Sequence, residues 1–357
     1  MSGRVIRFPS LAVSAEEATQ NAELILQTPR GERARQKKAL HLEDPETLLA
    51  LCSLLRARID TEPATARDEA DFFFHFISKP KRPIGLFDER EYFMGELALL
   101  AGAACRHLSR RQEAWVWFDR AEAGFRHTVN AAGDLSRLGY QRLAERFEER
   151  QVDVVLELLP SLIESFAALG MPEDALKARF LEGLALMEGD EPLKSAEVFE
   201  EIAAEATLAG NDRLVAAAYA NLTQVYAMAG NTEATIAASS RAIPVLRRLN
   251  DRIALAKVQW GLATLLRETG QHAASIEAYR QAQEQFGALG MRADTAALGL
   301  VIADLLLDEG QNAEALQEIA AALPVIDELK MAPEGMAALS LLRESARRQE
   351  VNRAALR

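Results

Sequence analysis

Residues 251–310 consist of three blocks, DRIALAKVQWGLATLLRETG, QHAASIEAYRQAQEQFGALG and MRADTAALGLVIADLLLDEG, and each block ends in a glycine. Gly230, Gly270 and Gly310 are 40 residues apart. A second series with the same spacing, offset by about half a period, consists of Gly170, Gly210, Asn250, Gly290 and Lys330. Glycine is favoured just after a helix C-terminus because it adopts the left-handed backbone at little cost. Each period therefore predicts helix, short turn, helix, short turn.

The apolar residues between these turn marks recur at helical spacing. One amphipathic face, with the i, i+3, i+4, i+7 pattern, consists of Leu214, Ala217, Ala218, Leu222 and Val225. A generic alanine-rich bundle has no reason to keep a 40-residue period over four units, so the pattern favours a repeat array. Asparagine is the usual substitute for glycine at such turns, whereas Lys330 departs from the pattern and predicts a different turn there.

Small and large residues also recur at fixed offsets around the turns. They are Ala101, Gly102, Cys105, Ser109, Ala114, Phe118 and Ala121 in one unit, Leu262, Ala263, Leu266, Gly270, Ser275, Tyr279 and Ala282 in another, and Ile302, Ala303, Leu306, Gly310, Ala315, Ile319 and Ala322 in a third. At these offsets the chain resembles tetratricopeptide (TPR) repeats, whose small residues lie where two helices cross. The usual TPR unit has about 34 residues. The 40-residue version resembles the longer units of bacterial signal-sensing regulators.

This resemblance implies an all-α fold, a right-handed α-α superhelical solenoid of TPR-like helix pairs with an N-terminal helical extension. We expect an N-terminal helical region with a flexible start (1–92), a solenoid (93–348) and a C-terminal tail (349–357). The expected units are about 94–133, 134–170, 171–210, 211–250, 251–290 and 291–330, with a capping helix at about 333–348. The third unit is expected to hold about one extra residue near 189–192. Pro244 and Pro324 should bend the second helices that contain them.

The first 92 residues do not fit the repeat. Ser14 with Glu17 predicts a capping box for a helix to about Thr28, and Asp44 begins a second predicted helix. The phenylalanines within 72–76 are interpreted as an inward face that packs on the first repeat, since exposing them would be costly. The segment 79–85 is expected to be a linker. The basic stretch, comprising Arg30, Arg33, Arg35, Lys37 and Lys38, is interpreted as a flexible connector rather than a contact for an anionic partner.

The bulk composition narrows the classes of function. The net charge of −12 removes any long-range attraction for phosphate backbones, so we expect no nucleic-acid partner. No signal-peptide core or long apolar run is present, which predicts a cytoplasmic protein with no membrane partner. Cys52 and Cys105 lie in apolar helical contexts and are expected to be buried and reduced.

No catalytic pattern stands out. The five histidines lack metalloprotease spacing, and two isolated cysteines cannot form a zinc site by themselves. Phosphate loops, nucleophile elbows and kinase motifs are absent. Ser195 and Ser275 occupy small packing positions. We therefore expect a non-catalytic protein that needs no metal and no cofactor.

In the TPR proteins that this chain resembles, the first helices of the units line a concave ligand-binding surface. Offsets from the turn marks give as inward candidates Lys177, Asn221, Gln224, Lys257, Trp260, Thr264, Arg267 and Asp304. Amides can pair with both the donor and the acceptor of a peptide backbone. In peptide-sensing TPR regulators an asparagine that matches Asn221 often holds the ligand, but neighbouring units have Leu181, Gly261 and Val301 there. The carboxylate clamp of chaperone-binding TPR proteins is missing.

Two functional hypotheses follow. The first is a protein- or peptide-binding scaffold that uses the concave face. The second is a regulator of a two-component or transcription system, as in Rap-like or peptide-sensing TPR regulators; no catalytic glutamine of the Rap type can be matched to Gln20, Gln27 or Gln36. The sequence leaves open the partner's identity and whether the chain forms a homodimer.

Overall fold

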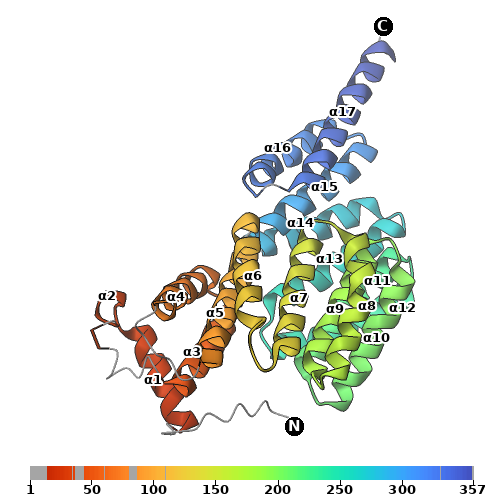
Figure 1. Cartoon of the computed structure of the whole chain (residues 1–357). Helices are drawn as coiled ribbons and strands as arrows, with labels where there is room; N and C mark the ends of the chain where they lie inside the picture. The colour runs from red at the N-terminus through yellow and green to blue at the C-terminus, as the bar shows by residue number, and fades with distance from the viewer. Residues whose placement is uncertain are drawn as a thin grey trace. The chain divides into compact units, whose positions relative to one another are not determined.

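The computed structural model describes residues 14–33, 35–36, 44–59, 61–79, 87–108, 110–329 and 331–355. They contain 17 helices and no strand (Figure 1). The chain divides into two compact units, one to Ala178 and one from Arg179. The helices are α1 (Ala15–Gln27), α2 (Arg30–Arg33), α3 (Pro45–Arg58), α4 (Pro63–Ile77), α5 (Phe87–His107), α6 (Arg111–Phe125), α7 (Ala131–Glu148), α8 (Val152–Ala168), α9 (Pro172–Glu188), α10 (Pro192–Leu208), α11 (Asp212–Met228), α12 (Thr232–Arg248), α13 (Arg252–Glu268), α14 (His272–Ala288), α15 (Arg292–Asp308), α16 (Asn312–Glu328) and α17 (Ala332–Ala355).

The helix pairs keep a strict register. Each helix from α8 to α16 has 17 residues and is followed by a three-residue connection. A residue with positive φ occupies every twentieth position, namely Arg150, Gly170, Asp190, Gly210, Gly230, Asn250, Gly270, Gly290 and Gly310. The two 40-residue series are therefore halves of one 20-residue series, and the all-α fold of TPR-like helix pairs is confirmed.

A backbone hydrogen bond closes each of these turns. The N–H that follows the left-handed residue donates to the carbonyl five residues earlier, as in Gln271 N to Leu266 O at 2.8 Å and Met291 N to Phe286 O at 2.9 Å. This is the 6→1 bond of the Schellman motif, which satisfies a carbonyl that the helix leaves unpaired. Met331 N makes the same bond to Ile326 O, although Lys330 itself lies outside the described residues.

The third unit corrects one expectation. It contains no extra residue, because α9 and α10 have the same length and connection as the other pairs. The left-handed position is held by Asp190, with φ of 59°, and the neighbouring Gly189 drew attention to the wrong residue. Aspartate tolerates this conformation better than most residues that carry a side chain.

The turns allow a direct measurement of backbone strain. Gly270 has φ of 74°, and a Cβ there would meet nothing within 4 Å. We predict that Gly270→Ala lowers the free energy of unfolding by about 1–2 kcal/mol through strain alone. Gly287→Ala is the matched control inside α14, where alanine should stabilise by about 0.5–1 kcal/mol. Urea unfolding of both variants measures the difference, and equal stabilities would contradict the role given to the turn.

Within a unit, a small residue of the first helix faces a large residue of the second. A Cβ on Gly183 would lie 2.7 Å from the Phe199 ring, so only glycine fits there. At the equivalent positions 80 residues later, Ala263 and Tyr279 are both buried. Two hydrogen bonds repeat with the same offset: the Oγ of Ser195 donates to Gly183 O at 2.7 Å, and the Oγ of Ser275 donates to Ala263 O at 2.9 Å. The expected packing role of the two serines is confirmed.

This crossing should not tolerate added volume. Ala263 is 0% exposed in the core that units 251–290 and 291–330 share. We predict that Ala263→Leu destabilises the chain by about 1–3 kcal/mol because the extra methyl groups overpack the crossing. The exposed Ala204 of α10 provides a control, since Ala204→Leu should be nearly neutral. Unchanged thermal stability of Ala263→Leu would contradict the packing described here.

The N-terminal helices begin where the sequence predicts. Ser14 Oγ accepts from Glu17 N at 3.2 Å at the start of α1, and Asp44 Oδ2 accepts from Thr47 N at 2.8 Å at the start of α3. On α4, Phe73 and Phe76 are buried, and the Phe74 ring meets Trp117 of α6 edge to face at 5.3 Å between centroids. The inward orientation of the phenylalanine cluster is thus confirmed. The linker expected at 79–85 lies, beyond Lys79, outside the described residues.

The basic stretch is not the flexible connector that we expected. Arg30 and Arg33 form the short helix α2, and Arg33 is 2% exposed. Arg33 bonds to Glu69 of α4 and also donates to Thr28 O at 2.6 Å, while Arg30 donates to Glu69 Oε1 at 3.0 Å. A buried charge is stable only when paired, so Glu69 fixes α2 against α4. Lys37 and Lys38 lie outside the described residues.

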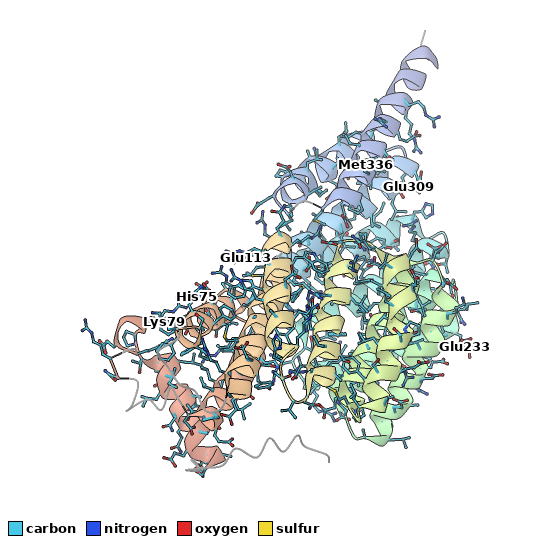
Figure 2. All side chains as sticks on the ribbon, viewed as in Figure 1. His75, Lys79, Glu113, Glu233, Glu309 and Met336 are labelled. Carbon is cyan, nitrogen blue, oxygen red and sulfur yellow. The ribbon has the colours of Figure 1, made fainter. Side chains whose placement is uncertain are left out.

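Ion pairs also connect the N-terminal helices to the helix pairs that follow. Arg67 of α4 pairs with Glu113 of α6 (Figure 2). Glu96 of α5 is fully buried and accepts from Arg56 of α3 and from Arg137 of α7. Helix α5 runs through residue 92, where the sequence placed the end of the N-terminal region, so this boundary crosses a continuous helix.

The C-terminal expectations are met in part. Pro244 and Pro324 lie inside α12 and α16, as the sequence indicates. The last helix, α17, is longer than the predicted cap and continues through most of the predicted tail. Cys52 and Cys105 are free and buried. Among the described residues, no helix combines the length and the apolar character that a membrane span requires.

One buried carboxylate has no hydrogen bond. Glu145 of α7 is 0% exposed, and neither of its oxygens has a hydrogen-bond partner. Arg111 of α6 lies 4.0 Å away, and Arg106 of α5, Glu148 and Glu149 also face the carboxylate. Burial, followed by the charge of Glu149, raises the pKa of Glu145.

This raised pKa predicts a dependence of stability on pH. Because the folded-state pKa exceeds the unfolded one, the protonated carboxyl stabilises the fold below the unfolded pKa, and this contribution is lost as pH rises through the folded pKa. We expect Glu145→Gln to be more stable than the parent at about pH 7 and equally stable near about pH 4. Urea midpoints at the two pH values test this, and a less stable variant at neutral pH would refute it.

Candidate functional site

The candidate groove lies on the first helices of the units, and α11 and α13 approach each other closely there. A Cβ on Gly261 would lie 3.0 Å from Thr223 Cγ2 and 3.1 Å from Gln224 N. Glycine therefore lets α13 contact the backbone of α11 directly. The inner faces of the two helices form one continuous wall at this level.

Two amides project from this wall on α11. Asn221 is half-buried, and its Nδ2 donates to Ala217 O at 2.9 Å, which leaves Oδ1 with no donor. Gln224 Nε2 donates to Thr264 Oγ1 at 3.4 Å, and Gln224 Oε1 has no donor although it is shielded from solvent. Each amide therefore retains one acceptor that the protein does not use.

Thr264 belongs to the wall's interior. It is 7% exposed, and its hydroxyl donates to Trp260 O at 3.1 Å. The hydroxyl of Tyr279, from α14, donates to Thr264 Oγ1 at 3.0 Å. Burial raises the pKa of Tyr279, so this donor stays protonated at neutral pH. The sequence showed Tyr279 only as a large packing residue, and nothing in its spacing signalled this hydrogen bond.

Trp260 and Lys257 occupy the exposed side of α13. Trp260 is half-buried, and its ring meets Phe286 edge to face at 6.1 Å between centroids. Lys257 is exposed and forms no ion pair with any described residue. Arg267, one turn after Thr264, lies 3.6 Å from Glu268 and remains partly exposed. An indole beside two cations can hold an apolar group and an anionic group together.

The remaining two candidates lie apart from this group. Asp304 is half-buried on α15 and has no ion-pair partner among the described residues. Lys177 belongs to the other compact unit and pairs with Asp174 at 3.1 Å. The structure thus brings together Asn221, Gln224 and the α13 residues.

The chemistry of these side chains suits recognition. They offer amide acceptors, an indole and cations, and the described residues contain no group of three or more His, Cys, Asp or Glu side chains that could hold a metal ion. An extended peptide needs donors and acceptors along its backbone and pockets for its side chains, and this wall offers both kinds of contact.

No family model matches the chain, and no curated protein matches it by sequence. Solved structures do match by fold. The apo form of RapI has a TM-score of 0.60 at 13% identity and covers 79% of this chain and 99% of its own. A Rap protein complexed with Competence and Sporulation Factor has 0.56 at 14%, covering 94% and 99%. NprR in complex with its cognate peptide NprX has 0.51 at 15%, covering 96% and 99%. At such identities the likeness establishes a TPR-like helical repeat fold.

Proposed function

We propose that this chain is a non-catalytic, cytoplasmic scaffold that binds a peptide or an extended protein segment along the inner face of α11 and α13. The observation that carries the proposal is the pair of unused acceptors, Asn221 Oδ1 and Gln224 Oε1, on one helix face. A buried acceptor without a donor costs about 1–3 kcal/mol, which a ligand N–H would recover.

Neighbouring side chains support the same ligand. Trp260 presents an aromatic surface that can hold an apolar side chain of the segment. Lys257 carries a charge that no described residue neutralises. Its position on α13, one turn before Trp260, suits a carboxylate of the bound segment.

The fold comparisons support this proposal independently of the side chains. NprR has the same fold and was solved with its cognate peptide, and a Rap protein was solved with Competence and Sporulation Factor. A fold that accommodates such a ligand in other proteins makes a groove ligand the simplest use of these acceptors. The sequence identity of at most 15% means that the ligand itself must be found by experiment.

Selection from a random peptide library on the purified chain tests the proposal. We predict that Asn221→Ala and Trp260→Ala each weaken the selected peptide about tenfold or more, which corresponds to about 1.4 kcal/mol. Gln281→Ala, an exposed amide on the second helix α14, is the matched control and should leave the affinity unchanged. If both groove variants bind as tightly as the parent, the groove is not the binding site.

A second candidate function is regulation of a two-component or transcription system. It is favoured by the match over nearly the whole length of the Rap and NprR chains, which includes the N-terminal helices before the repeats. Co-purification of the chain with response regulators encoded nearby, with and without the selected peptide, tests it. Peptide-dependent capture would support regulation, whereas peptide binding alone would support the scaffold.

A further inference from the structure

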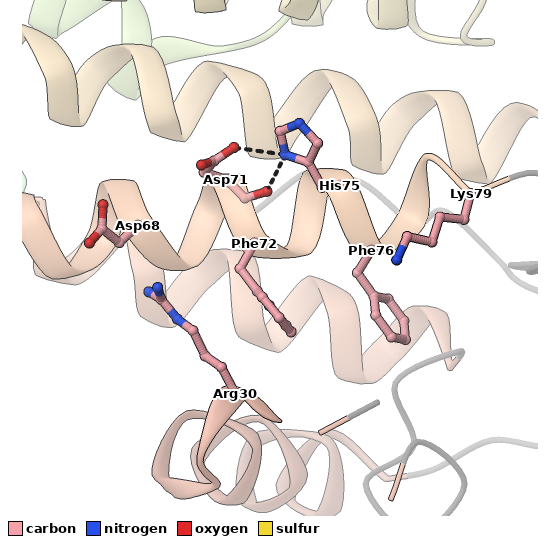
Figure 3. A pocket seen from close by; sticks show the side chains of 7 residues that line it. All are labelled: Arg30, Asp68, Asp71, Phe72, His75, Phe76 and Lys79. Atoms are coloured by element: carbon pink, nitrogen blue, oxygen red, sulfur yellow. Dashed lines mark hydrogen bonds and ion pairs between the residues drawn. The ribbon is translucent and has the colours of Figure 1, made fainter. Parts of the chain in front are cut away.

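A second hollow lies in the N-terminal unit, away from the repeat wall. It has a volume of about 350 Å³ and is lined by Arg30, Asp68, Asp71, Phe72, His75, Phe76 and Lys79 (Figure 3). This volume lies at the small end of the range for ligand pockets, which suits a single ring with one polar substituent.

Two helical stripes of α4 build the hollow. Phe72 and Phe76, one turn apart, place their rings on the same side of the helix, 6.3 Å apart and inclined by 25° (Figure 3). His75 and Lys79 form the second stripe at the same spacing. An aromatic surface therefore lies beside a polar edge, and a flat apolar group fits against the rings.

The carboxylates at one end are already neutralised. Asp71 Oδ1 lies 2.8 Å from His75 Nδ1, and Asp68 Oδ1 accepts from Arg67 at 2.9 Å. These pairs leave little attraction for a ligand cation at that end.

The positive charge at the other end is not neutralised. Lys79 is exposed and pairs with no described residue. Arg30 and Arg33 share the single carboxylate of Glu69, which leaves an excess of one positive charge beside Phe72. Cations gather at the aromatic surface, and a ligand anion would find two of them unmatched.

The C-terminus of α4 does not oppose an anion at Lys79. Helix ends normally present unpaired carbonyls, which would repel it. Here Phe74 O accepts from Ser78 N at 2.9 Å, His75 O accepts from Ser78 Oγ at 3.1 Å, and Ser78 O accepts from Arg90 at 2.8 Å. The carbonyls nearest to Lys79 are therefore satisfied.

We infer that this hollow binds an aryl carboxylate, with its ring against Phe72 and Phe76 and its carboxylate at Lys79. The ligand chemistry is that of a free aromatic acid or of a peptide that ends in phenylalanine. The site is independent of the repeat groove, since every residue that lines it lies on α2, on α4 or just after α4.

Titration of the full chain with benzoate, N-acetylphenylalanine and benzylamine, followed by ligand-observed NMR, tests the inference. We expect saturable binding of benzoate on the order of 1 mM and no binding of benzylamine, whose charge is reversed. Tighter binding of N-acetylphenylalanine than of benzoate would identify the peptide terminus as the source, and the reverse order would identify a free acid.

Two variants separate the site from unspecific binding. Lys79→Gln should weaken benzoate at least about fivefold, because the substitution removes the unmatched charge without burying anything. Lys194→Gln on α10, a lysine that already pairs with Glu191, should have no effect. Phe72→Leu should weaken both acids while the helical circular dichroism is retained. Absence of saturation by about 20 mM, equal affinity of Lys79→Gln, or equal binding of benzylamine would overturn the inference.

Discussion

The left-handed residue that ends each helix is the constraint on which the repeat depends. Its positive φ reverses the chain, and the 6→1 hydrogen bond after it ends the helix at the same residue each time. With helices of 17 residues and connections of three, every helix begins in the same phase as the one two places before it. Small and large residues therefore recur at fixed offsets, and one crossing geometry serves successive units.

Because the backbone register is fixed, the side chains at a crossing can exchange volume. Gly183 faces Phe199 and Ala263 is paired with Tyr279, whereas the unit between them has Thr223 and Ser239, both buried. The larger first-helix residue is matched by a smaller second-helix residue. The crossing thus conserves its total volume rather than the identity of either residue, as close packing of an interior requires. A search for one conserved residue type would miss this unit, whereas the period of the turns includes it.

The sequence reveals the features that depend on local geometry. Glycine at the turns and serine or aspartate at the first caps act on backbone within a few residues, so their spacing predicts the helices correctly. Asp190 and Arg150 occupy left-handed positions without being glycine, and the third unit was misjudged for that reason. The pairing of Arg33 with Glu69 joins residues 36 apart, and no periodic pattern encodes it. The Tyr279–Thr264 bond escaped notice for the same reason: it depends on how two helices meet, which only the structure specifies.

The groove follows from a departure within this regular array. Asn221 and Gly261 occupy the same offset in successive units, and the missing side chain at Gly261 lets α13 reach the backbone of α11. That approach brings Gln224 to Thr264, whose hydroxyl is in turn held by Tyr279 from α14. A ligand donor that engages Gln224 would therefore act on a polar chain that runs from the groove into the core. Strengthening one bond in such a chain polarises the next. Binding at this wall should consequently stiffen the α13–α14 pair as well as fill the groove, which distinguishes a ligand at Gln224 from one that rests only on Trp260.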